Sequence, residues 1–273
     1  MSYRSILVHV DGDAGSSARV RLAADLAQRF EASLTGMCAA MARPVIEMYG
    51  AGMASAEIAD VGREEVTAEL KAAEGRFNEA LAGSSVKRAW RAEYDFPAAA
   101  LADAAAAHDL LVVGQDRGVL RRDAYTTVIV GDLLMSAGRP VLVAPPGQTE
   151  LAAGNVLVAW KNSTEAKRAI VDALPLLARA KKVQLLQIGE GEDGRRSLDA
   201  AQAHLAAHRL AATADMRPRG KEVDQDILSA AAAAGADLIV AGAYGHSRMR
   251  EWVLGGVTRT LLTKSPIAVL LSH

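Results

Sequence analysis

The stretch DLLVVG at residues 109–114 decides the fold, because it returns as DLIVAG at residues 237–242. Each copy is a short apolar run that follows an aspartate and closes at a glycine, a pattern typical of a buried strand in a parallel sheet. Two further pairs repeat in the same order: SILVHVDG at 5–12 with NVLVAWKN at 155–162, and PVLVA at 140–144 with PIAVL at 266–270. The chain therefore contains one architectural unit twice.

Ala-rich helical segments separate the apolar runs, and this alternation predicts an α/β fold in which helices cover both faces of a parallel sheet. We expect strands near 5–10, 33–39, 86–92, 109–114 and 140–144, and again near 155–160, 182–188, 213–217, 237–242 and 266–271. The segment PPGQTE at 145–150 has the composition of a linker that ends near Gly154. We therefore expect two domains, 1–146 and 154–273. The alternative is one continuous ten-stranded sheet, although sheets of that size tend to curl or split.

Composition narrows the class of protein. The 273 residues are 51% hydrophobic and 23% charged with a formal net charge of −1, which describes a core-forming globular protein without the basic field that binds nucleic acid. Cys38 is the single cysteine, so disulfide frameworks and Cys-rich zinc modules are excluded, and a reducing cytoplasm is expected. We interpret Cys38 as a small buried residue. Because no apolar run reaches the roughly 20 residues that span a bilayer, we expect no membrane contact.

The first copy is longer than the second, and residues 41–61 are the expected insertion. This segment and the residues just before it include Met37, Met41, Met48 and Met53, which favour an adaptable apolar surface for a protein partner. A disordered loop is the alternative.

The segment that follows the fourth strand of the second copy, residues 242–258, is rich in glycine. Open parallel sheets bind ligands at the carboxyl ends of their strands, and Gly242 and Gly245 let the backbone leave the strand sharply there. Gly255 and Gly256 then open a helix whose free N–H groups suit a phosphate, and the hydroxyl of Thr258 adds a donor. Alternatively, these glycines form only a strand-end turn and a tight helix contact.

The spacing Gly242-x2-Gly245-x9-Gly255 resembles the ATP-binding signature of the universal stress protein family. Three segments resemble the tandem-domain branch of this family: GAYGHSR…LGGVTR from residue 242, AWKNSTEAKRA at 159–169 and GRPVLVAP at 138–145. The resemblance implies two tandem Rossmann-like (adenine nucleotide alpha hydrolase-like) domains, each with five parallel strands. It also implies an intramolecular pseudo-dimer in which the last strands of the two copies pair, with a homodimer of the whole chain as a further arrangement.

The resemblance implies ATP as the ligand, with AMP, ADP and the Mg²⁺ complex as alternatives. The three signature glycines and the backbone after them would surround phosphates and ribose, Ile188 would lie against adenine, and the turn after the first strand would complete the pocket. The implied binding residues are Trp160, Lys161, Ile188, Gly242, Tyr244, Gly245, His246, Arg248, Gly255, Gly256, Val257 and Thr258.

The second copy departs from the family pattern twice. Lys161 stands where the family usually has an aspartate, and it either meets a phosphate or is a solvated loop residue. Gly256 replaces a small hydroxyl residue. His246 and Arg248 are likewise phosphate-directed or plain surface residues.

The first copy retains Asp11 but spaces its glycines as Gly114-x3-Gly118. Asp132 lies near the start of the helix that follows, where we expect its carboxylate to cap the helix and fill the anion site, with Asp123 adding repulsion. This half should therefore bind nucleotide poorly.

Catalytic chemistry has little support. The sequence lacks a Gly-x4-Gly-Lys-Ser/Thr loop, so no catalytic residue is predicted, and slow ATP hydrolysis or autophosphorylation is the most that we expect. His204 and His208 have the i,i+4 spacing of zinc ligands but no third ligand is evident, so no metal is predicted. The sequence thus predicts a nucleotide-binding stress-response or regulatory protein. An interaction module that works through residues 41–61 and an unknown partner is the alternative.

Overall fold

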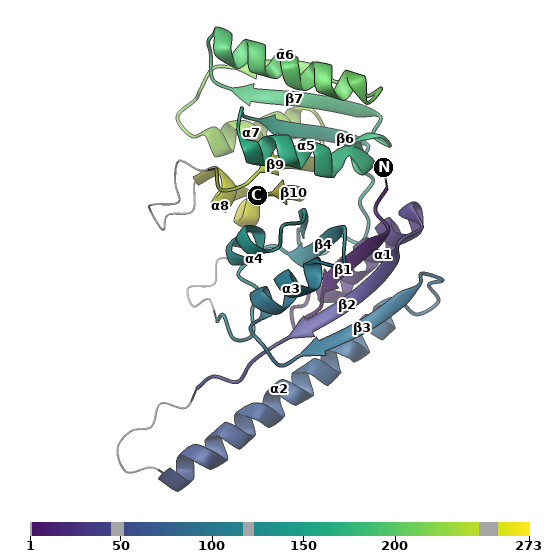
Figure 1. The fold of residues 1–273 in the computed structure, drawn as a ribbon, viewed down its shortest axis with the longest axis vertical. Coiled ribbons are helices and arrows are strands. Elements are labelled where there is room, and N and C mark those ends of the chain that lie inside the picture. The colour runs from purple at the N-terminus through teal and green to yellow at the C-terminus, as the bar shows by residue number, and fades with distance from the viewer. Residues whose placement is uncertain (1, 45–51, 117–122, 246–255) are drawn as a thin grey trace.

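The computed structural model describes residues 2–44, 52–116, 123–245 and 256–273. Strands and helices alternate along these residues, and every predicted strand is present with its ends within two residues of the prediction (Figure 1). The first half contains β1 (Ser5–His9), α1 (Ser16–Phe30), β2 (Ser33–Ala39), α2 (Gly52–Ala80), β3 (Arg88–Glu93), α3 (Pro97–Ala105), β4 (Leu110–Gly114), α4 (Val130–Ser136) and β5 (Val141–Ala144). The second half contains β6 (Asn155–Trp160), α5 (Thr164–Leu177), β7 (Lys182–Ile188), α6 (Glu192–Ala207), β8 (Thr213–Arg217), α7 (Val223–Ala233), β9 (Leu238–Gly242), α8 (Gly256–Lys264) and β10 (Ala268–Ser272).

The strands form one sheet in the order β3-β2-β1-β4-β5-β10-β9-β6-β7-β8. All pairs within each half are parallel, whereas β5 and β10 pair antiparallel, with Leu142 opposite Leu270. Hydrogen bonding therefore continues across the junction. The continuous ten-stranded sheet is the arrangement that forms, through the pairing of last strands that the family resemblance implies. Because the two halves run in opposite directions, their carboxyl ends lie at opposite edges of this sheet.

Each face of the sheet is covered by its own set of helices. Alternate residues of β1 point to opposite faces of the sheet. Ile6 and Val8 belong to the core on the face covered by α1, α2, α5 and α6, whereas Leu7 belongs to the core on the face covered by α3, α4, α7 and α8. All three of these side chains are fully buried. Because both faces of the central strands are buried, their sequences are unbroken apolar runs.

The connection between the halves is packed against the sheet layer. Leu151 and Ala153 are fully buried, and the Arg29 guanidinium at the end of α1 donates to the carbonyls of Leu151 and Ala152. The segment that looks like a linker by composition is therefore fixed to the first half at its end.

Helix α2 accounts for part of the predicted insertion. It has 29 residues where α6, its counterpart, has 16, and Figure 1 shows it projecting beyond the edge of the sheet. Residues 52–61 form its first turns, so the disordered-loop alternative is wrong for them, while 45–51 lie outside the described residues. Ile58 and Val61 are more than half exposed on this projection.

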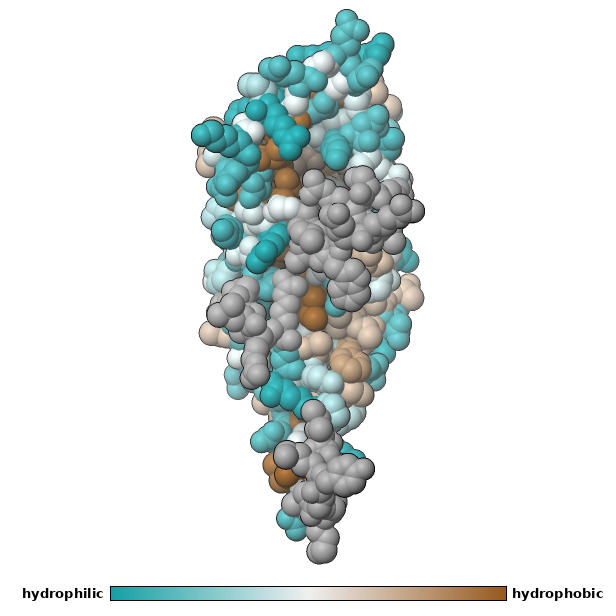
Figure 2. Space-filling model, turned by 90° about the vertical axis from the view of Figure 1, so that its left-hand side faces the viewer, coloured by the Kyte–Doolittle hydropathy of each residue, from teal (hydrophilic) through white to brown (hydrophobic). Residues whose placement is uncertain are grey.

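Figure 2 shows a mainly hydrophilic surface on the side it presents, with small separate hydrophobic areas, one of them at the narrow end formed by α2. Within the described part of the chain, none of the helices has the length and apolarity needed to cross a membrane.

Candidate functional site

The predicted nucleotide site lies at the carboxyl edge of the second half. Strands β9, β6 and β7 are neighbours, with Ala241 opposite Ala159 and Trp160 opposite Gln187. The topology therefore brings Gly242, Trp160 and Ile188 to the same edge of the sheet, where open α/β sheets hold their ligands.

Gly242 and Gly245 face the start of α5. A Cβ on Gly242 would overlap the backbone of Ala166 and would lie 2.6 Å from the carbonyl carbon of Glu165, so this glycine is required for helix packing. A Cβ on Gly245 would lie 3.2 Å from Glu165 Oε2. The helix-contact interpretation of Gly242 thus has direct structural support, and any phosphate role for this glycine comes in addition to it.

Glu165 is a residue of this edge that sequence reasoning missed. It lies in the first turn of α5, where the helix dipole favours a carboxylate, and its side chain is only 3% exposed. Ser163 caps the same helix by accepting a hydrogen bond from the Ala166 N–H at 3.3 Å. An acidic residue two positions after a Ser cap was the available signal. The protein therefore places a carboxyl group of its own beside Gly245.

The other predicted residues at this edge have distinct environments. Trp160 is buried, and its Nε1 donates to Ser197 Oγ at 3.0 Å. Lys161 is exposed and Ile188 is half-buried. Tyr244 adopts a left-handed backbone with φ of 58°, which turns the chain sharply after β9.

Helix α8 starts at Gly256, which is exposed, and no atom of the described residues lies within 4 Å of the place where a Cβ would stand. Val257 is half-buried and Thr258 is buried in the first turn. Because α8 connects the parallel strands β9 and β10, its amino end lies at the carboxyl edge of β9. His246, Arg248 and Gly255, predicted for the same site, lie outside the described residues.

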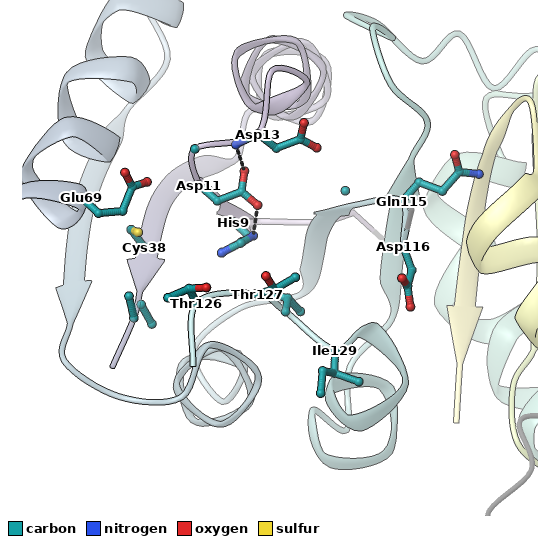
Figure 3. A pocket seen from close by; sticks show the side chains of 15 residues that line it. His9, Asp11, Asp13, Cys38, Glu69, Gln115, Asp116, Thr126, Thr127 and Ile129 are labelled. Atoms are coloured by element: carbon teal, nitrogen blue, oxygen red, sulfur yellow. Dashed lines mark hydrogen bonds and ion pairs between the residues drawn. The ribbon is translucent and has the colours of Figure 1, made fainter. Parts of the chain in front are cut away.

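A cavity of about 470 Å³ opens at the carboxyl edge of the first half. It is bounded by the ends of β1, β2 and β4, by the segment before α4 and by one side chain of α2 (Figure 3). The lining residues are His9, Asp11, Gly12, Asp13, Cys38, Ala39, Ala40, Glu69, Gly114, Gln115, Asp116, Thr126, Thr127, Val128 and Ile129. This cavity lies in the half that the sequence predicts to be the poorer nucleotide binder.

A buried polar cluster forms the floor of this cavity. Arg19 from α1 is 3% exposed, and its Nη2 contacts Asp11 Oδ1 at 2.8 Å while its Nε donates to the His9 carbonyl at 2.8 Å. Burial alone would raise the pKa of Asp11, but Arg19 and His9 outweigh it, and the pKa falls to about 2. Burial lowers the pKa of His9 to about 4 despite the nearby Asp11 carboxylate, so the imidazole is neutral at pH 7.

Cys38 and Glu69 close one side of the cavity. Burial, followed by the charge of Glu69, raises the pKa of the Cys38 thiol to about 12. Glu69 forms an ion pair with Arg76, about two turns further along α2. The thiol is therefore protonated and lacks the properties of a nucleophile, which agrees with its interpretation as a small buried residue.

The expected blocking of this half by Asp132 is wrong. Asp132 is exposed in the first turn of α4 and does not line the cavity, so its carboxylate does not fill the site. Asp123 instead binds Arg43 at 2.6 Å and accepts a hydrogen bond from Thr126 Oγ1 at 3.0 Å. Its charge is thereby neutralised by a neighbouring arginine.

The two helical histidines form no metal site with other described residues. The rings of His204 and His208 meet edge to face with centroids 4.9 Å apart. Over the described ranges, no group of three His, Cys, Asp or Glu side chains could hold a metal ion.

Two five-stranded parallel units, each open at its carboxyl edge and joined through antiparallel last strands, define a tandem α/β protein of the Rossmann-like class. The model of the universal stress protein family matches residues 2–145 and again residues 153–273, so the chain belongs to this family.

Solved structures agree with this assignment. A universal stress protein from Archaeoglobus fulgidus is 15% identical, with a TM-score of 0.71 over 98% of this chain and 95% of that chain. A protein of unknown function from Pseudomonas aeruginosa is 17% identical, with a TM-score of 0.59 over 99% of this chain and 92% of that chain. These two likenesses show the shared fold. A universal stress protein in complex with cAMP is 23% identical, with a TM-score of 0.36 over 53% of this chain and 98% of that chain. Comparison with curated proteins gives no significant match.

The sequence predicts a site at the carboxyl edge of the second half, but it did not predict the cavity at the carboxyl edge of the first half. Of the cavity residues, only Asp11 and Gly114 were singled out as parts of a site, and His9, Glu69, Thr126 and Thr127 were missed. The signal for His9 was an ionisable residue inside an apolar strand, two positions before Asp11. Glu69 lies 58 positions from Asp11 in a helix whose packing no local pattern reveals.

Proposed function

We propose that this universal stress protein binds an adenine nucleotide, ATP foremost, in its second half and works as a stress-response or regulatory protein in the cytoplasm. The observation that carries the proposal is the amino end of α8. This nine-residue helix starts at an exposed Gly256 that no other described residue crowds, at the edge that also carries Gly242, Trp160 and Ile188. Its first N–H groups and its dipole suit a phosphate group.

The full proposed site consists of the residues predicted from the sequence, with the domains taken as 1–146 and 154–273. The phosphates would lie against the backbone of Gly245, Gly256 and Val257, within reach of the Thr258 hydroxyl and the exposed Lys161. His246, Arg248 and Gly255 belong to the same proposal from their place in the sequence alone. AMP, ADP and the Mg²⁺ complex of ATP are the alternative forms of the ligand.

The best test variant is Gly256→Asp. It adds a carboxylate where phosphate should bind, in open space and at a helix start that accepts acidic residues, so the fold should be unaffected. Gly256→Asn has the same shape without the charge and is the matched control. Calorimetric titration should show at least a tenfold loss of ATP affinity in Gly256→Asp relative to Gly256→Asn. Equal affinity in the two variants would refute the phosphate site.

The structure makes Gly245→Asp a poorer test, because the new side chain would meet Glu165 and its folding cost would mix with any loss of binding. We expect a binding role without rapid turnover, since the sequence lacks a Gly-x4-Gly-Lys-Ser/Thr loop. Hydrolysis by the wild type at a rate well above that of Gly256→Asp would instead favour a slow ATPase.

A second function, contact with another protein, is favoured by one observation. Ile58 and Val61 are one helical turn apart on the projecting part of α2, and both are more than half exposed. Mass spectrometry of nucleotide released from freshly purified protein separates the two proposals. Bound nucleotide supports the first, whereas a nucleotide-free protein that is unchanged by added ATP leaves the α2 surface as the working site.

A further inference from the structure

The cavity of the first half contains a buried hydrogen-bond acceptor without a protein partner. His9 is 2% exposed, and its Nδ1 lies 3.5 Å from Asp11 Oδ2. Its Nε2 is buried and has no hydrogen-bond partner among the residues that the structure describes. Figure 3 shows this edge of the ring turned away from Asp11, toward the space between Cys38 and Thr126. A buried polar atom left unsatisfied destabilises the protein, and a ligand donor would relieve that cost.

The protonation state of His9 fixes what kind of group can bind there. Burial lowers the pKa of His9 to about 4, so the ring is neutral at pH 7. The Asp11 carboxylate beside Nδ1 assigns the proton of the neutral ring to that nitrogen. Nε2 therefore presents a lone pair, and it requires an O–H or N–H group from the ligand.

The rest of the lining also accepts hydrogen bonds. Asp11 and Glu69 are already neutralised by Arg19 and Arg76. Each carboxylate nevertheless retains lone pairs beyond those used in its ion pair, because two oxygens offer about four acceptor positions. Asp11 Oδ1 accepts hydrogen bonds from the Arg19 guanidinium and from the Asp13 N–H, while Asp11 Oδ2 faces His9. Such a floor suits a neutral donor, since the charges beside it are already paired.

The described residues of this cavity offer little to hold a phosphate. Among the described residues that line it, none is lysine or arginine. Arg19 lies beneath Gly114 and is engaged by Asp11. Helix α4 has only seven residues, so its amino end offers no built anion site. Within the described part of the first half, the proposed phosphate site of the second half has no counterpart.

We propose that this cavity is a second ligand site, selective for an uncharged molecule of about nucleoside size whose hydroxyl or amino groups donate to His9 Nε2 and the Asp11 and Glu69 carboxylates. Phosphorylated forms of the same molecule are rejected. The volume of about 470 Å³ lies within the range of small-molecule sites. The apolar side chains of Ala39, Ala40 and Val128 provide the remaining contact surface. This site is independent of the nucleotide site proposed for the second half.

The test uses adenosine and AMP, which share their base and ribose and differ by one phosphate. The full chain is labelled with ¹⁵N-histidine, and the Nε2 signal of His9 is identified by its loss in His9→Gln. Adenosine should shift this signal in a saturable way, and AMP should require at least a tenfold higher concentration. No saturable shift with adenosine, or equal affinities for the two ligands, would overturn the proposal.

Calorimetry with His9→Phe and His9→Gln provides the second measurement. His9→Phe removes the acceptor and should reduce adenosine affinity at least tenfold, whereas His9→Gln retains a side-chain acceptor and should lose less. If His9→Phe does not fold, the ¹⁵N titrations of the wild type with adenosine and with AMP still decide the question. Wild-type adenosine affinity in a folded His9→Phe would refute the proposal.

The two proposals fail separately. ATP binding that is sensitive to Gly256→Asp and insensitive to His9→Gln supports the site of the second half. Adenosine binding that is sensitive to changes at His9 and insensitive to Gly256→Asp supports the ligand site in the cavity of the first half.

Discussion

Replacing Arg19 with methionine tests the buried polar cluster beneath the cavity of the first half. Arg19 links Asp11 to the His9 carbonyl and is almost fully buried. Methionine retains most of the apolar stem that packs in the core, so the change mainly removes the charge and its hydrogen bonds. Asp11 is then left beside a neutral histidine with no cationic partner at 2.8 Å.

The magnitude follows from the pKa of Asp11. A shift from 3.8 to about 2 corresponds to about 2 kcal/mol of folding free energy at neutral pH, because one pKa unit is worth about 1.4 kcal/mol. The lost hydrogen bond to the His9 carbonyl adds about 1 kcal/mol. Asp11 is 25% exposed, so water offsets part of the loss. We expect Arg19→Met to lower the free energy of unfolding by about 3 kcal/mol at pH 7.

Urea unfolding of four proteins measures this value: wild type, Arg19→Met, Asp11→Asn and the double variant. The double variant should recover much of the loss, because it removes the charge that Arg19→Met leaves unpaired. Arg63→Met is the control, since its pair with Asp60 is exposed on α2 and should contribute no more than about 0.5 kcal/mol.

Acid provides an independent check. The stability that Asp11 contributes is present above pH 3.8 and is lost as the pH falls toward 2, so the advantage of wild type over Asp11→Asn should shrink across this window. A loss below about 1 kcal/mol in Arg19→Met, or a double variant less stable than the wild type by the full sum of the two single-variant losses, would refute the coupled cluster.

Three further predictions concern the same half. The unfolded chain takes up a proton at His9 near pH 6.5, but the folded chain does so only near pH 4, so wild type should lose about 3 kcal/mol more stability than His9→Gln as the pH falls through this interval; parallel stability curves would contradict this. Gly36→Ala places a Cβ 2.5 Å from the Phe77 ring and should cost about 1–3 kcal/mol in thermal unfolding. Gly75→Ala, in open space on α2, should add about 0.5–1 kcal/mol, and equal effects of the two changes would rule out the packing argument. Iodoacetamide at pH 8 should leave native Cys38 unmodified and label it in urea, since its pKa is about 12 in the fold; equal labelling rates would show that the thiol is accessible.

The central strands could be predicted because helices cover both of their faces. Every residue of a strand such as β4 is covered by helices on one side or the other, so the local sequence alone records the strand. The duplication then sets the strand order of the second half from the first. The pairing of β5 with β10 joins residues that are over 120 positions apart, and only the resemblance to the family pointed to it.

Helix α2 shows where local pattern stops being informative. Glycines at 52, 62 and 75 and few apolar positions near its start weaken the helical signal. What makes the segment helical further along is tertiary packing, in which Ala73 and Phe77 are buried against the sheet. The helix propensity of its residues predicts the projecting part of α2 poorly. That part extends from turns further along the helix, which are already formed and provide the helix nucleus.

The two edges of the sheet illustrate the same limit at the functional sites. Arg19 meets Gly114 from 95 positions away, and Glu165 meets Gly245 from 80 positions away. In each half an ionisable side chain at the start of the first helix reaches the glycine-rich end of the fourth strand: Arg19, already paired with Asp11, in the first half, and Glu165 in the second. A glycine motif records only where the backbone can approach a ligand. The side chains beside that backbone come from the facing helix, so motif spacing alone does not describe the chemistry of either edge.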